Sequence, residues 1–202
     1  MAQTPEILRQ LARKRTSGET CELCGVEIGP EHPHLAEPEA RQLLCSCRAC
    51  ALLFSGDAET RYHVVPDRVQ LLERFAITDD QWDSLLLPVN MAYFFFHSPA
   101  KRMVALYPGP AGSTESLLTL DAWRELVEAN PELTGMRPDV EGLLVNRVGE
   151  GREYFIAPID RYYELVGLIK SGWTGLSGGT EVWRDIGGFF DRLRRQSVRV
   201  KA

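Results

Sequence analysis

The side chains with the most distinctive chemistry gather near the start of the chain. All five cysteines lie between positions 21 and 50, and two pairs, Cys21/Cys24 and Cys47/Cys50, each enclose two residues. A C-x2-C turn can direct both thiolates at one metal ion, and Gly25 can adopt the backbone angles that close the first turn. The 22 residues between the pairs are near the upper end of the usual spacing. The pattern predicts one closed, tetrahedral, structural Zn²⁺ site made of four thiolates.

Three further side chains in this segment could also bind a metal. Cys45 is one thiol more than a tetrahedral site needs, and His32 and His34 fall between the two cysteine pairs. Cys45 is either a buried thiol beside the site or a ligand that exchanges with Cys47 and makes the site respond to oxidation. His34 and His32 are further alternate ligands. An iron–sulfur cluster also takes four cysteines, but paired C-x2-C motifs around a hairpin-length loop are typical of zinc.

No catalytic arrangement accompanies these ligands. His63 and His97 are isolated in the sequence, and no Gly-x-Ser-x-Gly motif supplies a nucleophile. The glycine-rich stretch 172–180 has neither a preceding strand nor a Gly-Lys-Ser/Thr motif, so we interpret it as a connection between two helices. The sequence therefore assigns no catalytic residue and no cofactor besides zinc, and it favours a role other than catalysis.

The cysteine pairs must be positioned by a small module at the start of the chain. A Thr4-Pro5-Glu6 start predicts a short helix that continues to about Arg15. The first cysteine pair then forms a knuckle, a hairpin follows, and the second pair opens a segment of helical character. This order is typical of a treble-clef finger, which we favour over a plain zinc ribbon. We place the N-terminal helix and the finger in residues 1–56 and a second domain in residues 57–202.

The second domain is predicted to be an antiparallel α+β domain, because short turns join its consecutive strands. Two units of a hairpin followed by a helix resemble each other in plan. The expected strands are 61–65, 69–75, 92–96, 102–107, 142–146 and 153–157. One expected helix begins at Thr78, and the other three cover 120–129, 160–170 and 180–195. Thr180 is expected to cap the last of these helices.

Composition limits the classes of protein to consider. The chain has 202 residues and a net charge of −5, and its first 50 residues carry six Lys/Arg against seven Asp/Glu. A finger of this charge lacks the positive surface that phosphate backbones attract, which argues against a nucleic-acid partner. The start does not resemble a signal peptide, and the longest nearly apolar run, 91–97, is too short to span a bilayer. We therefore expect a cytoplasmic protein without membrane insertion, in which closely spaced thiols are more often metal ligands than disulfides.

Several segments together resemble an uncharacterised actinobacterial family with an N-terminal CxxC…CxCxxC motif. They are Cys21-Glu22-Leu23-Cys24, Glu31-His32-Pro33-His34-Leu35, the stretch from Leu43 to Phe54, Tyr163-Glu164-Leu165-Val166-Gly167, Trp173, Gly178-Gly179 and Trp183. The resemblance covers most of the chain, and the cysteine segment is its most specific part. Members of that family are often encoded near nickel–iron hydrogenase genes. The resemblance thus implies an accessory role in hydrogenase assembly and names no catalytic residue.

Three functions follow as hypotheses. The first is a zinc-binding accessory or adaptor protein that acts through protein–protein interaction. The second is a thiol-based redox or metal-transfer protein that uses the surplus Cys45. The third, a nucleic-acid binder, is the least consistent with the charge of the finger.

Overall fold

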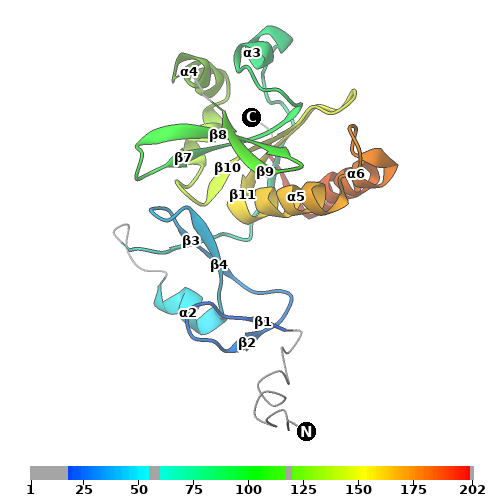
Figure 1. The fold of residues 1–202 in the computed structure, drawn as a ribbon. Helices are drawn as coiled ribbons and strands as arrows, with labels where there is room; N and C mark the ends of the chain where they lie inside the picture. Colours follow the sequence, from blue (N-terminus) through cyan, green and yellow to red (C-terminus); the bar gives the residue numbers. More distant parts are fainter. Residues whose placement is uncertain (1–17, 55–59, 117–119, 201–202) are drawn as a thin grey trace, which may run out of the picture.

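The computed structural model describes residues 18–54, 60–116 and 120–200, and it has the mixed α+β composition that the sequence predicts. The helix expected over residues 4–15 lies outside the described residues. Figure 1 shows a small module at the start of the chain below a larger sheet with helices. The cysteines all fall in the small module, which we call the finger.

The finger combines two small sheets and one short helix. A two-stranded sheet holds β1 (Glu19–Thr20) and β2 (Glu27–Ile28), and the hairpin of β3 (His34–Glu37) and β4 (Gln42–Cys45) leads directly into helix α2 (Arg48–Leu53). Strand β5 (His63–Val64) pairs with the free edge of β3, so the chain contributes a third strand to this sheet before it enters the larger one.

The larger sheet has seven strands in the order β12-β6-β11-β10-β7-β8-β9. Their bounds are β6 Gln70–Leu72, β7 Met91–His97, β8 Arg102–Gly109, β9 Gly112–Ser116, β10 Glu141–Asn146, β11 Glu153–Pro158 and β12 Val198–Val200. The two expected hairpins are present as β7–β8 and β10–β11, and these two hairpins are joined through β7 and β10.

The sequence did not predict two strands of this sheet. Strand β9 is polar and lies at one edge, and β12 lies at the other edge in the basic tail that follows the last helix. Strand β12 runs parallel to β6, so the prediction of a purely antiparallel domain is wrong for this pair. A parallel pairing is possible here because the two strands are far apart in the sequence, so the chain between them, which includes most of the sheet domain, can bring β12 back in the direction of β6.

Helices cover both faces of the sheet. Helices α5 (Ile159–Gly172) and α6 (Gly179–Gln196) pack on one face, and α3 (Asp79–Ser84) and α4 (Leu120–Ala129), followed by the 3₁₀ helix η1 (Pro131–Gly135), cover the other. None of the helices in the described part of the chain is long and apolar enough to cross a bilayer.

Strand β7 illustrates how the two cores form. Tyr93 and Phe95 belong to the core beneath α5 and α6, whereas Ala92 and Phe94 belong to the core beneath α3 and α4. Alternate side chains of a strand point to opposite faces, so an unbroken apolar run is required where both faces are buried. The strand expected over 92–96 is therefore present and is buried on both faces except at Phe96, which is 37% exposed.

The helix starts agree with the sequence in one case and differ in another. Thr78 caps α3 as predicted: its hydroxyl accepts from the Gln81 N–H, and the Gln81 side chain accepts from the Thr78 N–H. Thr180 does not cap α6. That helix begins one residue earlier, at Gly179, because Gly178 takes a left-handed conformation (φ 87°) that ends the connection from α5.

Candidate metal centre

The first cysteine pair lies on a tight knuckle. The Cys21 N–H donates to the Val26 carbonyl at 2.8 Å, and the Gly25 N–H donates to the Cys21 carbonyl at 2.8 Å. Gly25 has φ of 75°, the left-handed conformation that a residue with a Cβ rarely adopts. These bonds fold residues 21–26 back on themselves, so the thiols of Cys21 and Cys24 can face one point.

The second cysteine pair lies at the start of α2. Cys47 is the N-cap residue, and its Sγ accepts from the Cys50 N–H at 3.4 Å. Two residues of spacing at a helix start place both side chains on one turn, and the unpaired N–H groups there favour negative charge. The start of α2 therefore holds both thiols of the second pair on one turn.

The fold brings the two pairs together. One sulfur atom from each of Cys21, Cys24, Cys47 and Cys50 lies within 4.8 Å of the other three, and the Cys24 and Cys47 sulfurs are 3.8 Å apart. A tetrahedral ion with metal–sulfur bonds of about 2.3 Å would hold its thiolates about 3.8 Å apart. All five cysteines are free thiols. The four thus form a cluster that could hold a metal ion.

Burial and hydrogen bonding divide the four thiols electrostatically. Burial alone would raise the pKa of Cys21, but backbone N–H donors of Cys47, Cys24 and Leu23 outweigh it and lower the pKa to about 6. Burial, with the hydrogen bonds to neighbouring thiols, raises the pKa of Cys50 to about 12. The backbone thus stabilises the thiolate of Cys21, and a metal ion bound among the sulfurs would favour the thiolate form of Cys50 as well.

The three alternate ligands lie together, apart from this cluster. Cys45, at the end of β4, groups with His32 and His34, and one ligand atom from each lies within 4.8 Å of the other two. Burial raises the pKa of the Cys45 thiol, and the nearby carboxylates of Glu22 and Glu19 raise it further.

An exposed apolar surface lies next to the four-cysteine cluster. Leu52 and Leu53 at the end of α2 are 68% and 78% exposed, and Phe54 and Val26 are also exposed. Several large exposed apolar side chains in one small module are a candidate contact surface. We call Val26, Leu52, Leu53 and Phe54 the finger's apolar face.

Histidines join the finger to the sheet domain. His34 of β3 lies 3.0 Å from Asp160 of α5, and His63 of β5 lies 3.5 Å from Asp139. From the sheet domain, Nε2 of His97 lies 3.0 Å from the carbonyl oxygen of Pro38, which is in the β3–β4 turn of the finger. Sequence reasoning treated His63 and His97 as isolated, because the contacts that define them cross from one module to the other.

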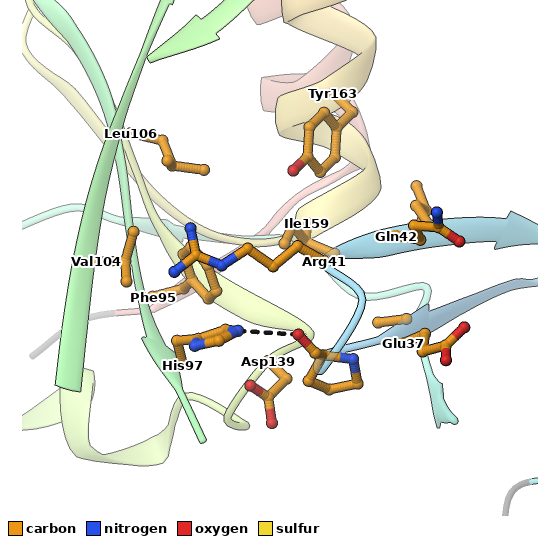
Figure 2. Close-up of a pocket in the computed structure, with 13 residues that line it drawn as sticks. Glu37, Arg41, Gln42, Phe95, His97, Val104, Leu106, Asp139, Ile159 and Tyr163 are labelled. Atoms are coloured by element: carbon orange, nitrogen blue, oxygen red, sulfur yellow. Dashed lines mark hydrogen bonds between the residues drawn. The ribbon is translucent and has the colours of Figure 1, made fainter. Parts of the chain in front are cut away.

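A cavity of about 70 Å³ lies at this junction. Figure 2 shows the Arg41 side chain of the finger reaching toward Phe95 of β7 and Val104 of β8, and Glu37 and Gln42 also line the cavity. Two of its charged groups have partners: Arg41 pairs with Glu115 at 2.9 Å, and Asp139 Oδ1 accepts from the Ser98 N–H at 2.8 Å. The buried Oδ2 of Asp139 has no hydrogen-bond partner among the described residues and faces His63 at 3.5 Å. We interpret the cavity as part of the interface that docks the finger, and not as a catalytic site.

The glycine-rich stretch before α6 is the helix–helix connection that the sequence predicts. Thr174 and Gly178 form an isolated bridge that closes the loop, and the Trp173 and Trp183 rings meet edge to face at 6.1 Å. The indole N–H of Trp183 donates to the Ser177 carbonyl at 2.9 Å. These contacts hold the loop closed, with partners from the loop itself and from the first turns of α6.

Comparisons with known proteins identify a family without a stated activity. Neither a curated protein nor a solved structure gives a significant match to the chain. A family model described as a family of unknown function, DUF5947, matches residues 20–197, which include the finger and nearly all of the sheet domain. The chain therefore belongs to the DUF5947 family.

Proposed function

We propose that this protein is a zinc-binding accessory or adaptor protein whose finger is held by one structural Zn²⁺ on Cys21, Cys24, Cys47 and Cys50. The observation that carries the proposal is the four-thiol cluster, because a donor set of sulfur alone suits zinc and leaves no coordination position for a substrate. Iron would use the same four ligands, but the paired turns at this spacing favour zinc.

The order of elements supports a treble-clef arrangement. A knuckle that contains Cys21 and Cys24 is followed by the β3–β4 hairpin, and Cys47 and Cys50 open the helix that comes directly after it. In this arrangement the metal fastens the knuckle to the helix start. The small sheets of the finger bury little apolar surface, so the metal would supply much of the finger's stability.

The finger's apolar face supports a role in protein binding. Its residues closely follow Cys24 and Cys50 in the sequence, and its exposed leucines would gain from burial against a partner. The family resemblance implies an accessory role in the assembly of nickel–iron hydrogenase, which we propose takes place in the cytoplasm. We propose a hydrogenase subunit or assembly factor as the partner.

The alternative function, a redox thiol at Cys45, has less support. Reactive cysteines have a depressed pKa and an electropositive setting, whereas burial and two carboxylates raise the pKa of Cys45. Nucleic-acid binding remains disfavoured by the charge of the finger.

Affinity purification of the full chain from its native host tests the proposal. We expect hydrogenase subunits or their assembly factors to co-purify with the wild-type chain and to be lost with Leu53→Asp. Leu176→Asp, which changes an exposed leucine in the loop before α6, far from the finger's cysteines in the sequence, is the matched control and should retain them. Equal recovery with both variants, or a purified chain without metal, would contradict the adaptor hypothesis.

A further inference from the structure

We propose that His32, His34 and Cys45 form a second metal site, which takes a Zn²⁺-like divalent cation and leaves one coordination position open. The grouping of the three ligand atoms within 4.8 Å is the starting observation. The site goes beyond the structural zinc of the proposed function, because it has a mixed nitrogen and sulfur donor set and only three protein ligands.

The backbone places the three side chains on one side of the finger. His34 and Cys45 are direct cross-strand partners in the β3–β4 hairpin, so their side chains leave the same face of the sheet. Pro33 favours an extended conformation at His32, and two residues of extended chain return a side chain to the same face. The His32 and His34 rings accordingly meet with centroids 4.9 Å apart.

Hydrogen bonds to the Nδ1 atoms prepare both imidazoles for metal binding. His32 Nδ1 donates to the Gly29 carbonyl at 2.8 Å, and His34 Nδ1 donates to the Asp160 carboxylate at 3.0 Å. A neutral imidazole that donates from Nδ1 keeps its lone pair on Nε2. A carbonyl or carboxylate behind the ring is also the usual outer partner of a metal-bound histidine.

The Nε2 atom of His32 gives a second observation that points to a metal ion. The His32 side chain is only 6% exposed, and its Nε2 is buried without a hydrogen-bond partner among the described residues. A buried nitrogen lone pair without a partner costs free energy, which a metal ion at this position would offset. This observation is independent of the spacing of the three ligands.

The main chain at Cys45 is fixed separately from the four-cysteine cluster. Its N–H donates to the Glu22 carboxylate at 2.6 Å, and its carbonyl accepts from the Glu22 N–H at 2.9 Å. Ser46, the residue between Cys45 and Cys47, is fully buried and donates from both its N–H and its hydroxyl to the Pro33 carbonyl. Cys45 is therefore fixed opposite His34 of β3, while Cys47 is held at the start of α2.

The open position would face a broad cleft of about 1030 Å³ between the finger and the sheet domain. Both histidines line this cleft, together with Arg48 of α2 and Asp160 and Arg161 of α5. Three protein ligands with a fourth position open to solvent are the arrangement of metal sites that bind an exchangeable ligand or pass the metal on. The four-cysteine cluster offers no such position.

Zinc content per full-length chain, measured by elemental analysis after equilibration with Zn²⁺ and removal of free metal, tests the second site. We expect two zinc ions in the wild type and one in both His34→Gln and Cys45→Ser. His63→Gln is the matched control, because His63 is also 26% exposed and also faces a carboxylate, and it should retain two. Circular dichroism verifies that each variant is folded.

Asp160→Asn provides a variant that removes no ligand. Loss of the carboxylate behind His34 should weaken the second zinc by about 10- to 100-fold in a chelator competition, with the first zinc unchanged. In titrations with Co²⁺, the second equivalent should give a thiolate charge-transfer band that Cys45→Ser lacks.

One zinc in the wild type, or two in both His34→Gln and Cys45→Ser, would overturn the second site. A single zinc that depends on the four cysteines would leave the proposed function intact. A chain that binds no zinc would contradict both proposals, so their failures can be told apart.

Discussion

His34 and Cys45 face each other directly across β3 and β4, and the same His34 ring contacts Asp160 at the start of α5. One histidine thus connects the strand that carries Cys45 to the first turn of a helix in the sheet domain. Occupancy of the second metal site would consequently stabilise the docking of the finger as well as the finger itself.

Removal of the metal should affect the two modules unequally. A finger held by the proposed zinc would lose its main support with the metal, whereas the sheet domain has two large apolar cores that contain no proposed metal ligand. Treatment with a chelator should therefore accelerate amide hydrogen exchange in residues 18–54 and leave the central strands β7 and β10 protected. Hydrogen exchange with mass spectrometry is the measurement, and restored protection after addition of Zn²⁺ is its control. Equal loss of protection in both modules would contradict the prediction.

A buried carboxylate should make the stability of the sheet domain depend on pH. Burial alone would raise the pKa of Glu141, but hydrogen bonds from the Arg68 side chain and the Arg137 N–H, with the charges of both arginines, hold the pKa below its ordinary value. A lowered pKa in the folded state contributes stability above the unfolded pKa of about 4.3, and this contribution is lost as the pH falls through the folded pKa.

Glu141→Gln should remove this contribution. At pH 7 we expect a loss of about 1–2 kcal/mol in the free energy of unfolding, because Arg68 is half-exposed and its pairing is partly screened. The difference from the wild type should shrink below about pH 4. Urea unfolding followed by tryptophan fluorescence at the two pH values measures it, and a difference that does not change with pH would refute the electrostatic explanation.

Two glycines should respond in opposite directions to replacement by alanine. A Cβ at Gly142 in β10 would lie 2.4 Å from the Phe94 carbonyl oxygen and 2.7 Å from the Tyr93 ring, so Gly142→Ala should destabilise the chain by about 3 kcal/mol. Gly167 in α5 is exposed and has open space around it, so Gly167→Ala should stabilise by about 0.5–1 kcal/mol. Thermal unfolding of both variants checks the pair, and a shift of the same sign in both would contradict the packing of β10 on β7.

The sequence predicted those parts of the fold that depend on local pattern. The strands around Tyr93 and Leu144 were predictable because unbroken apolar runs flanked by turns indicate buried strands. Strand β9 has no apolar pattern, and β12 is a strand only because Val198 and Val200 pair with β6, far away in the sequence. Such edge strands are defined by their partners, and a pattern within one segment cannot reveal them.

In the candidate site, too, the sequence predicts the local features and misses the long-range contacts. The thiol pairs were visible as short spacings, since a two-residue turn is a local property of the chain. The contact of His34 with Asp160 joins positions 126 residues apart, and no local signal announces it. The pairing of His34 with Cys45 did have a signal: both lie at equal distances from the centre of the β3–β4 turn, and a register drawn for this hairpin would have separated Cys45 from the four other cysteines.

The most direct test of the central claim is zinc-edge X-ray absorption on the His34→Gln protein, in which the second site is disabled. The account predicts one zinc per chain surrounded by four sulfur atoms at about 2.3 Å, with no nitrogen or oxygen neighbours. A zinc ion with nitrogen or oxygen in its first shell, or a folded protein without zinc, would contradict the assignment of Cys21, Cys24, Cys47 and Cys50 as a closed structural site.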